Sequence, residues 1–167
     1  LARRDDRAPL QHLTGEAWFR HVRLEVGPGV FTPRPETELL AGWGIEAVEA
    51  AGPTESPVVV DLCTGSGAIA KAVAHEAPRA RVHAVELDEP AHRWAERELA
   101  GTGVDLRQGD LGEAFDELAG TVDVVVSNPP YIPHEAWESV AVEVRDHDPQ
   151  LALYASGDGL DTIRVVE

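Results

Sequence analysis

The fold is decided by one stretch in the first half of the chain, Val58-Val59-Val60-Asp61-Leu62-Cys63-Thr64-Gly65-Ser66-Gly67-Ala68. Its first five residues are almost entirely apolar, which is typical of a strand that a parallel sheet buries on both faces. The glycines that follow allow a tight turn. A helix is predicted over residues 68–76, because Pro78 cannot continue it. A strand, a glycine turn and a helix in this order predict the start of a β-α-β unit.

The same alternation continues downstream of this stretch. Strands are predicted over residues 81–87, 104–108 and 122–126, and a helix over residues 89 to about 100. This order predicts an α/β fold with a doubly wound, mostly parallel sheet. The fourth strand of such a sheet lies next to the first, so we expect the turns that follow these two strands to face each other.

A β-hairpin and a helix are predicted upstream of the sheet. Residues 22–26 alternate apolar and charged side chains, which is the period of a half-buried strand. The turn Gly27-Pro28-Gly29 should lead into a returning strand over residues 30–32. A helix is expected over residues 36–50, followed by a loop over residues 52–57. The predicted apolar face of that helix consists of Leu39, Leu40, Trp43, Ala47 and Val48.

The last part of the chain has a weaker pattern. Residues 151–154 are predicted as a short extended piece, residues 156–159 as a turn, and residues 160–167 as a helix. The chain contains no methionine and opens Leu1-Ala2-Arg3-Arg4. From these features we expect a truncated chain or a processed one.

The composition narrows the class of protein. The chain has 167 residues, 30 acidic and 14 basic side chains and a formal net charge of −16. This charge disfavours a surface that neutralises nucleic-acid phosphates. The longest apolar run is too short for a membrane span, so no membrane association is expected. The single cysteine, Cys63, excludes an internal disulfide and favours a reducing, cytoplasmic location. No metal is expected, because the histidines are scattered without the spacing of metal ligands. They are His12, His21, His75, His83, His92, His134 and His147.

Acidic residues follow three successive predicted strands. Asp61 precedes the glycine loop, where a carboxylate would repel phosphate and would suit an amine or a sulfonium cation. Glu86 ends the second strand, at a position suited to ribose hydroxyls. After the third strand, Asp110 can accept from an adenine amino group and Leu111 can cover the ring. Together these positions predict a site for a nucleoside-bearing ligand.

The turn Asn128-Pro129-Pro130-Tyr131 follows the fourth predicted strand. Its two prolines fix φ and remove two N–H donors, which leaves a stiff loop that presents carbonyl acceptors. The Asn128 side chain adds a further acceptor, and Tyr131 supplies a flat aromatic face. The turn therefore suits a planar amino group whose nitrogen is presented to an electrophile.

The chain resembles the HemK/PrmC family, S-adenosylmethionine-dependent methyltransferases that modify a glutamine side chain of peptide chain release factors. The resemblance rests on five segments: Leu10-Gln11-His12-Leu13-Thr14-Gly15, Phe31-Thr32-Pro33-Arg34-Pro35-Glu36-Thr37-Glu38, Asp61-Leu62-Cys63-Thr64-Gly65-Ser66-Gly67, Asn128-Pro129-Pro130-Tyr131-Ile132-Pro133 and Gly157-Asp158-Gly159-Leu160-Asp161. The Asn-Pro-Pro-Tyr turn is also found in adenine-N6 methyltransferases, whereas the segment from Pro33 to Glu38 favours the release-factor branch. The family usually has glycine in place of Cys63 and aspartate in place of Glu86.

The resemblance implies the function and most of the site. The expected activity is methylation of the side-chain amide nitrogen of a release-factor glutamine, with S-adenosylmethionine as cofactor, a release factor as partner and no direct nucleic-acid contact. The cofactor-binding residues are then Asp61, Cys63, Thr64, Gly65, Ser66, Gly67, Glu86, Asp110, Leu111 and Asn128. The catalytic residues are Asn128, Pro129 and Tyr131, and Pro130 joins these three in binding substrate.

The resemblance also implies the domain organisation. Residues 1–52 are a linker helix, a hairpin and a first helix that lead into the catalytic domain. Residues 53–167 are a Rossmann-like methyltransferase core whose carboxyl-terminal strands are missing. Two alternatives remain. One is an adenine-N6 methyltransferase acting on RNA or DNA, and the other is a non-catalytic binding module that keeps the cofactor pocket.

Overall fold

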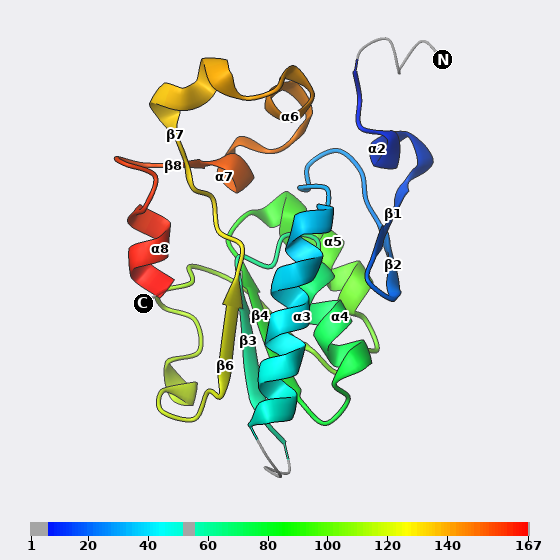
Figure 1. The fold of residues 1–167 in the computed structure, drawn as a ribbon, viewed down its shortest axis with the longest axis vertical. Coiled ribbons are helices and arrows are strands. Elements are labelled where there is room, and N and C mark those ends of the chain that lie inside the picture. Colours follow the sequence, from blue (N-terminus) through cyan, green and yellow to red (C-terminus); the bar gives the residue numbers. More distant parts are fainter. Residues whose placement is uncertain (1–6, 52–55, 167) are drawn as a thin grey trace.

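The computed structural model describes residues 7–51 and 56–166. Its centre is a four-stranded parallel sheet in the order β5-β4-β3-β6. These strands are β3 (Val58–Leu62), β4 (Arg81–Glu86), β5 (Asp105–Gln108) and β6 (Val124–Ser127). The helices α4 (Ala68–Glu76) and α5 (Glu89–Leu99) connect the first three of them (Figure 1). The predicted fold class is therefore confirmed. The proposed domain boundary at residues 52–53 and the opening residues 1–4 lie outside the described residues.

Each face of the sheet is covered by different elements. On one face, α3 (Pro35–Ala50), α4 and α5 pack with the hairpin into the main hydrophobic core, together with Val59, Val82, Ala84 and Val126. On the other face a smaller cluster forms around Val60, Leu62, Val85 and Phe115. It is covered by the segment between β5 and β6, with the 3₁₀ turn η1 (Asp116–Leu118), and by Val166 of α8 (Asp161–Val166).

The hairpin exists, but its predicted partner strand was wrong. Its strands are β1 (Glu16–Phe19) and β2 (Val22–Glu25), joined at Arg20 and His21, where Arg20 has φ 48°. The alternating residues correctly marked β2, but they pair with the segment before them. Residues 30–32 form no strand. They run past the main site instead, and Val30 and Thr32 are fully buried.

The helix α3 begins one residue earlier than predicted, at Pro35, and its predicted apolar face was only partly right: Val48 is buried and Leu40 packs against the core. Leu39 and Trp43 are 64% and 66% exposed. The buried side consists of Ala41, Gly44 and Val48. A Cβ on Gly44 would lie 2.8 Å from a methyl carbon of Val126, so small residues are needed where the helix approaches β6. Close backbone packing, rather than side-chain size, decides which face of α3 is buried.

The chain after β6 crosses above the carboxyl ends of the strands before descending as α8 (Figure 1). It contains β7 (Ile132–Pro133), the 3₁₀ segment η2 (His134–Ser139), α6 (Val142–His147), α7 (Gln150–Leu153) and β8 (Tyr154–Ala155). β7 and β8 pair in parallel. The extended piece predicted over residues 151–154 is largely a helical turn, because Pro149, with φ −61°, is preorganised for a helix start. At the other end of the chain, α2 (Leu10–Thr14) precedes the hairpin.

Within residues 7–51 and 56–166, no helix combines the length and apolar character needed to cross a membrane. The same residues contain no cluster of three or more histidine, cysteine or acidic side chains arranged to hold a metal ion.

A candidate pocket at the switch point of the sheet

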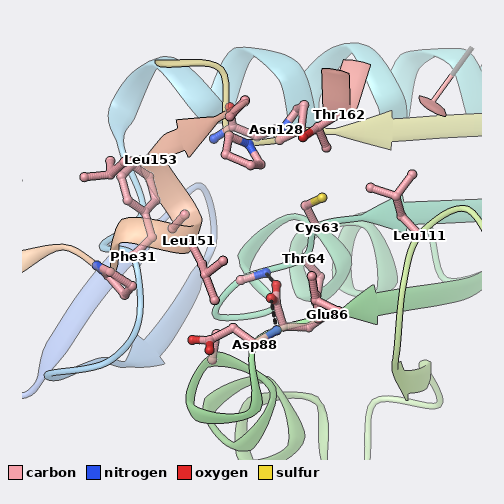
Figure 2. A pocket seen from close by; sticks show the side chains of 18 of the residues that line it. Phe31, Cys63, Thr64, Glu86, Asp88, Leu111, Asn128, Leu151, Leu153 and Thr162 are labelled. Carbon is pink, nitrogen blue, oxygen red and sulfur yellow. Dashed lines mark hydrogen bonds between the residues drawn. The ribbon is translucent and has the colours of Figure 1, made fainter. Parts of the chain in front are cut away.

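A cavity of about 410 Å³ lies at the carboxyl ends of the strands, between the turn after β3 and the turn after β6 (Figure 2). Because these strands are neighbours, the turns face each other where the strand order reverses. The predicted site residues that line it are Cys63, Thr64, Gly65, Ser66, Glu86, Asp110, Leu111, Asn128, Pro129, Pro130 and Tyr131. Asp61 and Gly67 do not line it. Gly67 faces the core instead, where a Cβ would lie 3.1 Å from Leu99.

Asp61 supports the glycine loop from behind. Its side chain is fully buried, and its Oδ2 accepts hydrogen bonds from Thr64 Oγ1 at 2.5 Å and from the Ala70 amide at 3.1 Å. Burial raises the pKa of Asp61 to about 7, against the opposing effect of these two donors. The carboxyl group therefore shapes the loop. The sequence position had suggested that Asp61 faces a cation in the pocket, and this expectation was wrong.

Glu86 joins the end of β4 to the glycine loop. Its Oε2 accepts from the Gly65 amide at 2.8 Å, and its Oε1 accepts from the Asp88 amide at 2.8 Å (Figure 2). Burial raises the pKa of Glu86, and the two amides oppose that rise. A carboxylate has about four acceptor positions, so two remain for ligand hydroxyls. Glu86 can thus hold both the loop and a ribose.

Cys63 occupies a backbone conformation that favours glycine. Its φ is 61°, in the left-handed region, and its sulfur points toward the pocket (Figure 2). Burial, followed by the nearby charges of Glu86 and Asp61, raises the pKa of the Cys63 thiol to about 12. Because the thiolate is the reactive form, this thiol is inert at neutral pH.

Asp110, which follows β5, is exposed, and its Oδ1 accepts a hydrogen bond from the Gly112 amide at 2.8 Å. Leu111 lies beside it on the pocket wall (Figure 2). A Cβ built on Gly65 would meet no atom within 4 Å, so the loop backbone is open to a ligand there. Backbone amides, an acidic group and apolar Leu111 together match the chemistry of an adenosine-bearing cofactor.

The turn after β6 is fixed from three sides. Ser127 Oγ donates to the Leu62 carbonyl at 2.8 Å, and Asn128 Nδ2 donates a long hydrogen bond of 3.5 Å to Thr37 Oγ1. From the third side, Gly159 lies directly against the Tyr131 carbonyl, where a Cβ would come within 2.5 Å of the oxygen. The Tyr131 side chain is 59% exposed at the pocket mouth. The turn is therefore rigid while its aromatic face remains accessible.

Sequence reasoning missed much of the apolar wall. The additional lining residues include Phe31, Pro33, Thr37, Leu151, Leu153, Tyr154 and Thr162. Phe31 and Thr37 belong to a segment that stood out only through the family resemblance. No local sequence pattern marks Leu151 and Leu153 as pocket residues. They reach the pocket only because the segment that carries them, more than 100 residues after Phe31 in the sequence, folds back across the sheet.

Comparison with known proteins defines the class. The family described as methyltransferase domain matches residues 59–147, and the chain belongs to this family. Over all of its length, the chain is 62% identical to a release factor glutamine methyltransferase of Streptomyces coelicolor and covers 59% of that protein. A release factor glutamine methyltransferase of Mycolicibacterium smegmatis is 49% identical over 99% of this chain and 58% of its own length. The family resemblance seen in the sequence is thereby confirmed.

Two further relatives bear on function and fold. The 4-amino-L-phenylalanine/4-methylamino-L-phenylalanine methyltransferase of Streptomyces pristinaespiralis is 47% identical over all of this chain and 58% of its own length. The catalytic domain of hMettl16, solved in complex with MAT2A 3'UTR hairpin 6, superposes with a TM-score of 0.60. That match covers 84% of this chain and 54% of the other at 12% identity, so it shows the shared fold alone. The chain spans less than two thirds of the curated relatives that it matches.

Proposed function

We propose that the protein containing this chain methylates the side-chain amide nitrogen of a glutamine in a peptide chain release factor. The observation that carries the proposal is the position of the Asn128–Tyr131 turn, which faces the glycine loop across one pocket. The 62% identical relative named for this activity supports the choice of substrate. A release factor would then be the protein partner, and the work of such an enzyme on translation supports a cytoplasmic location.

The proposed cofactor is S-adenosylmethionine, which supplies an electrophilic methyl group when it is bound. Glu86 would accept from its ribose hydroxyls, Asp110 and Leu111 would hold its adenine, and the Cys63–Ser66 backbone would line its path. The fit rests on the open space at Gly65 and on the remaining acceptor capacity of Glu86.

The turn residues orient the substrate nitrogen. An amide –NH₂ has two N–H donors, and the Asn128 Oδ1 and the Pro129 carbonyl can accept one each. In the described part of the chain no backbone amide donates to the Pro129 carbonyl. Tyr131 can stack on the amide plane. These acceptors also favour positive charge developing on the nitrogen, and near-attack positioning of this kind is worth about 7–11 kcal/mol.

A panel of methyl acceptors tests the proposal. A glutamine amide, an adenine amino group and an arylamine are all planar –NH₂ groups, so the turn alone does not separate them. We expect methyl incorporation from labelled S-adenosylmethionine into a release factor, and none into tRNA, DNA or 4-amino-L-phenylalanine. Methylation of tRNA or DNA would favour the adenine-N6 alternative. Methylation of 4-amino-L-phenylalanine would place the protein with its 47% identical relative. Cofactor binding without any transfer would favour a binding module.

A further inference from the structure

The pocket wall beside Tyr131 is built from two segments that are far apart in the sequence. Phe31, Pro33 and Thr37 line it from before and within the first turn of α3, and Pro149 and Leu151 line it from the crossing segment. Figure 2 shows Phe31 and Leu151 on the same side of the cavity, together with Leu153. What holds the two segments together therefore decides the shape of this wall.

An ion pair joins the two segments. Arg34 Nη2 donates to Asp148 Oδ2 at 2.5 Å. The Asp148 side chain is 0% exposed and that of Arg34 is 31% exposed. The guanidinium carbon of Arg34 also lies 4.9 Å from the centre of the Phe31 ring, which it covers. Arg34 thus contacts the pocket-lining Phe31 directly. Through its ion pair with Asp148 it is also tied to the next residue, Pro149, which lines the pocket as well.

The carboxylate of the pair is buried, whereas the Arg34 guanidinium remains partly exposed. Thr32 is fully buried, and its Oγ1 lies 3.1 Å from His12 Nε2. Burial raises the pKa of Asp148, and the Arg34 charge with the Thr32 backbone opposes that rise. Desolvation makes such a pair a weak stabiliser, while loss of one partner is costly. Removal of either partner is therefore expected to cost stability as well as geometry, so a test of the pair needs a readout besides activity.

The geometry that it fixes includes the catalytic turn. Arg34 is the N-cap residue of α3, and Thr37, three residues later, accepts from Asn128 Nδ2. A displacement of Arg34 would therefore be passed to Asn128 through one helical turn, and to Leu151 through Asp148 and Pro149. Neither Arg34 nor Asp148 lines the pocket.

We propose that Arg34 and Asp148 are positioning residues for methyl transfer, which hold the wall formed by Phe31, Thr37 and Leu151 in register with Asn128. This inference rests on the proposed function only for the choice of substrate. The pair would set the presentation of the acceptor nitrogen, whereas the cofactor half of the pocket is held separately by Glu86 and Asp61.

The test uses Arg34→Lys and Asp148→Asn in the whole protein. The matched control is the pair Arg20–Glu76, which is also long-range and partly buried, with contacts of 2.8 and 2.7 Å. Unlike Arg34, which covers the pocket-lining Phe31, Arg20 donates to Glu76 and to the Glu38 carbonyl, and neither residue lines the pocket. We expect Arg34→Lys and Asp148→Asn to lower kcat by roughly 10- to 100-fold, the scale of an ångström-sized misplacement. The dissociation constant of S-adenosylmethionine, measured by calorimetry, should change by less than about threefold, because its binding residues are untouched. Arg20→Lys and Glu76→Gln should leave kcat within about threefold of wild type.

A second measurement covers variants that fold poorly. Hydrogen exchange of the amides of residues 150–155 should accelerate in Arg34→Lys and stay unchanged in Arg20→Lys, at a temperature where circular dichroism shows all proteins folded. Equal loss of kcat in the control pair, or a cofactor affinity that falls in proportion to kcat, would overturn the inference. If wild type methylates another acceptor in the panel, the proposed function fails, and the positioning role is then judged by the same ratios on that acceptor.

Discussion

At position 63 a side chain occupies a backbone geometry that glycine adopts freely. A left-handed φ of 61° destabilises an ordinary residue by about 1–2 kcal/mol. Glycine would relieve this strain, but it would lose about 0.5–1 kcal/mol more in conformational entropy on folding. These effects nearly cancel. With a pKa of about 12, the Cys63 thiol stays protonated at neutral pH, and no chemical role is expected for it.

We therefore expect Cys63→Gly to retain cofactor affinity and kcat, with a change in unfolding free energy below about 1 kcal/mol. Calorimetry, steady-state kinetics and urea unfolding measure the three quantities. A folded variant that binds cofactor normally but transfers no methyl group would assign the thiol a chemical role.

Asn128 is the residue expected to contribute most to the chemistry. Its interactions should strengthen as the nitrogen becomes positive, so their loss should appear in kcat more than in KM. Asn128→Ala should lower kcat by roughly 100-fold or more and leave cofactor affinity nearly unchanged. A near-normal kcat on a release factor would remove this turn from the active site.

Asn128→Asp separates charge stabilisation from orientation. Aspartate still accepts hydrogen bonds but cannot donate to Thr37 Oγ1, as Asn128 Nδ2 does at 3.5 Å. Partial activity is expected if the acceptor matters most. An aspartate variant as slow as the alanine variant would instead assign the main role to the amide donor.

Asp61 makes stability depend on pH. Its folded pKa of about 7 lies above the ordinary value of 3.8. Between about pH 4 and pH 7 the folded protein keeps a proton that the unfolded chain has released, so this group makes stability fall as pH rises, by about 1.4 kcal/mol per unit of pKa difference. Above about pH 7 Asp61 is ionised in both the folded and the unfolded protein, and the stability lost by ionising it in the folded state no longer changes with pH. Asp61→Asn should gain stability relative to wild type from pH 5 to pH 8 in urea unfolding, and a pH-independent difference would refute this.

At the scale of the elements, the sequence predicts what depends on local pattern. The strands β3 and β4 were predicted to within one residue, and β3 has the nearly continuous apolar run of a strand buried on both faces. The partner of β2 was wrong and the buried face of α3 only partly right, because strand pairing and the close approach of Gly44 to Val126 depend on tertiary contacts. For the same reason the site was predicted at the two turns and missed on the Phe31–Leu151 wall.

Besides its apolar contacts, the hairpin is joined to α4 and α5 by a partly buried polar contact around Lys71. Lys71 Nζ donates to Glu98 Oε2 at 2.7 Å and to the Arg23 carbonyl at 2.8 Å, while Glu98 Oε1 accepts from the Glu25 amide at 2.9 Å. Glu98 is only 8% exposed. Lys71→Met should lower the unfolding free energy by about 3 kcal/mol, since it leaves a buried carboxylate without its cation.

The control for this prediction is the double variant Lys71→Met/Glu98→Leu, which removes the buried charge as well. It should recover part of the loss in urea unfolding. A single variant within about 0.5 kcal/mol of wild type would show that the ion pair does not anchor the hairpin.

For the whole molecule, the net charge of −16 is the main electrostatic feature. Like charges repel within the compact state, and exposed ion pairs offset this by little. Raising the salt concentration from 0.01 to 1 M shortens the screening length from about 30 to about 3 Å. We expect the melting temperature to rise over this range in calorimetric scans. A falling melting temperature would mean that the surface ion pairs outweigh the repulsion.

The contact of Gly159 with the Tyr131 carbonyl affects the order in which the site is completed during synthesis on the ribosome. The glycine loop, β3 and Glu86 are all synthesised before the Asn128–Tyr131 turn, and the Gly159 contact with that turn can form only when residue 159 follows. At about 5–20 residues per second, the 28 residues from 131 to 159 take roughly 1–6 s to synthesise. In the nascent chain, the residues proposed to bind the cofactor therefore precede the complete support of the proposed catalytic turn.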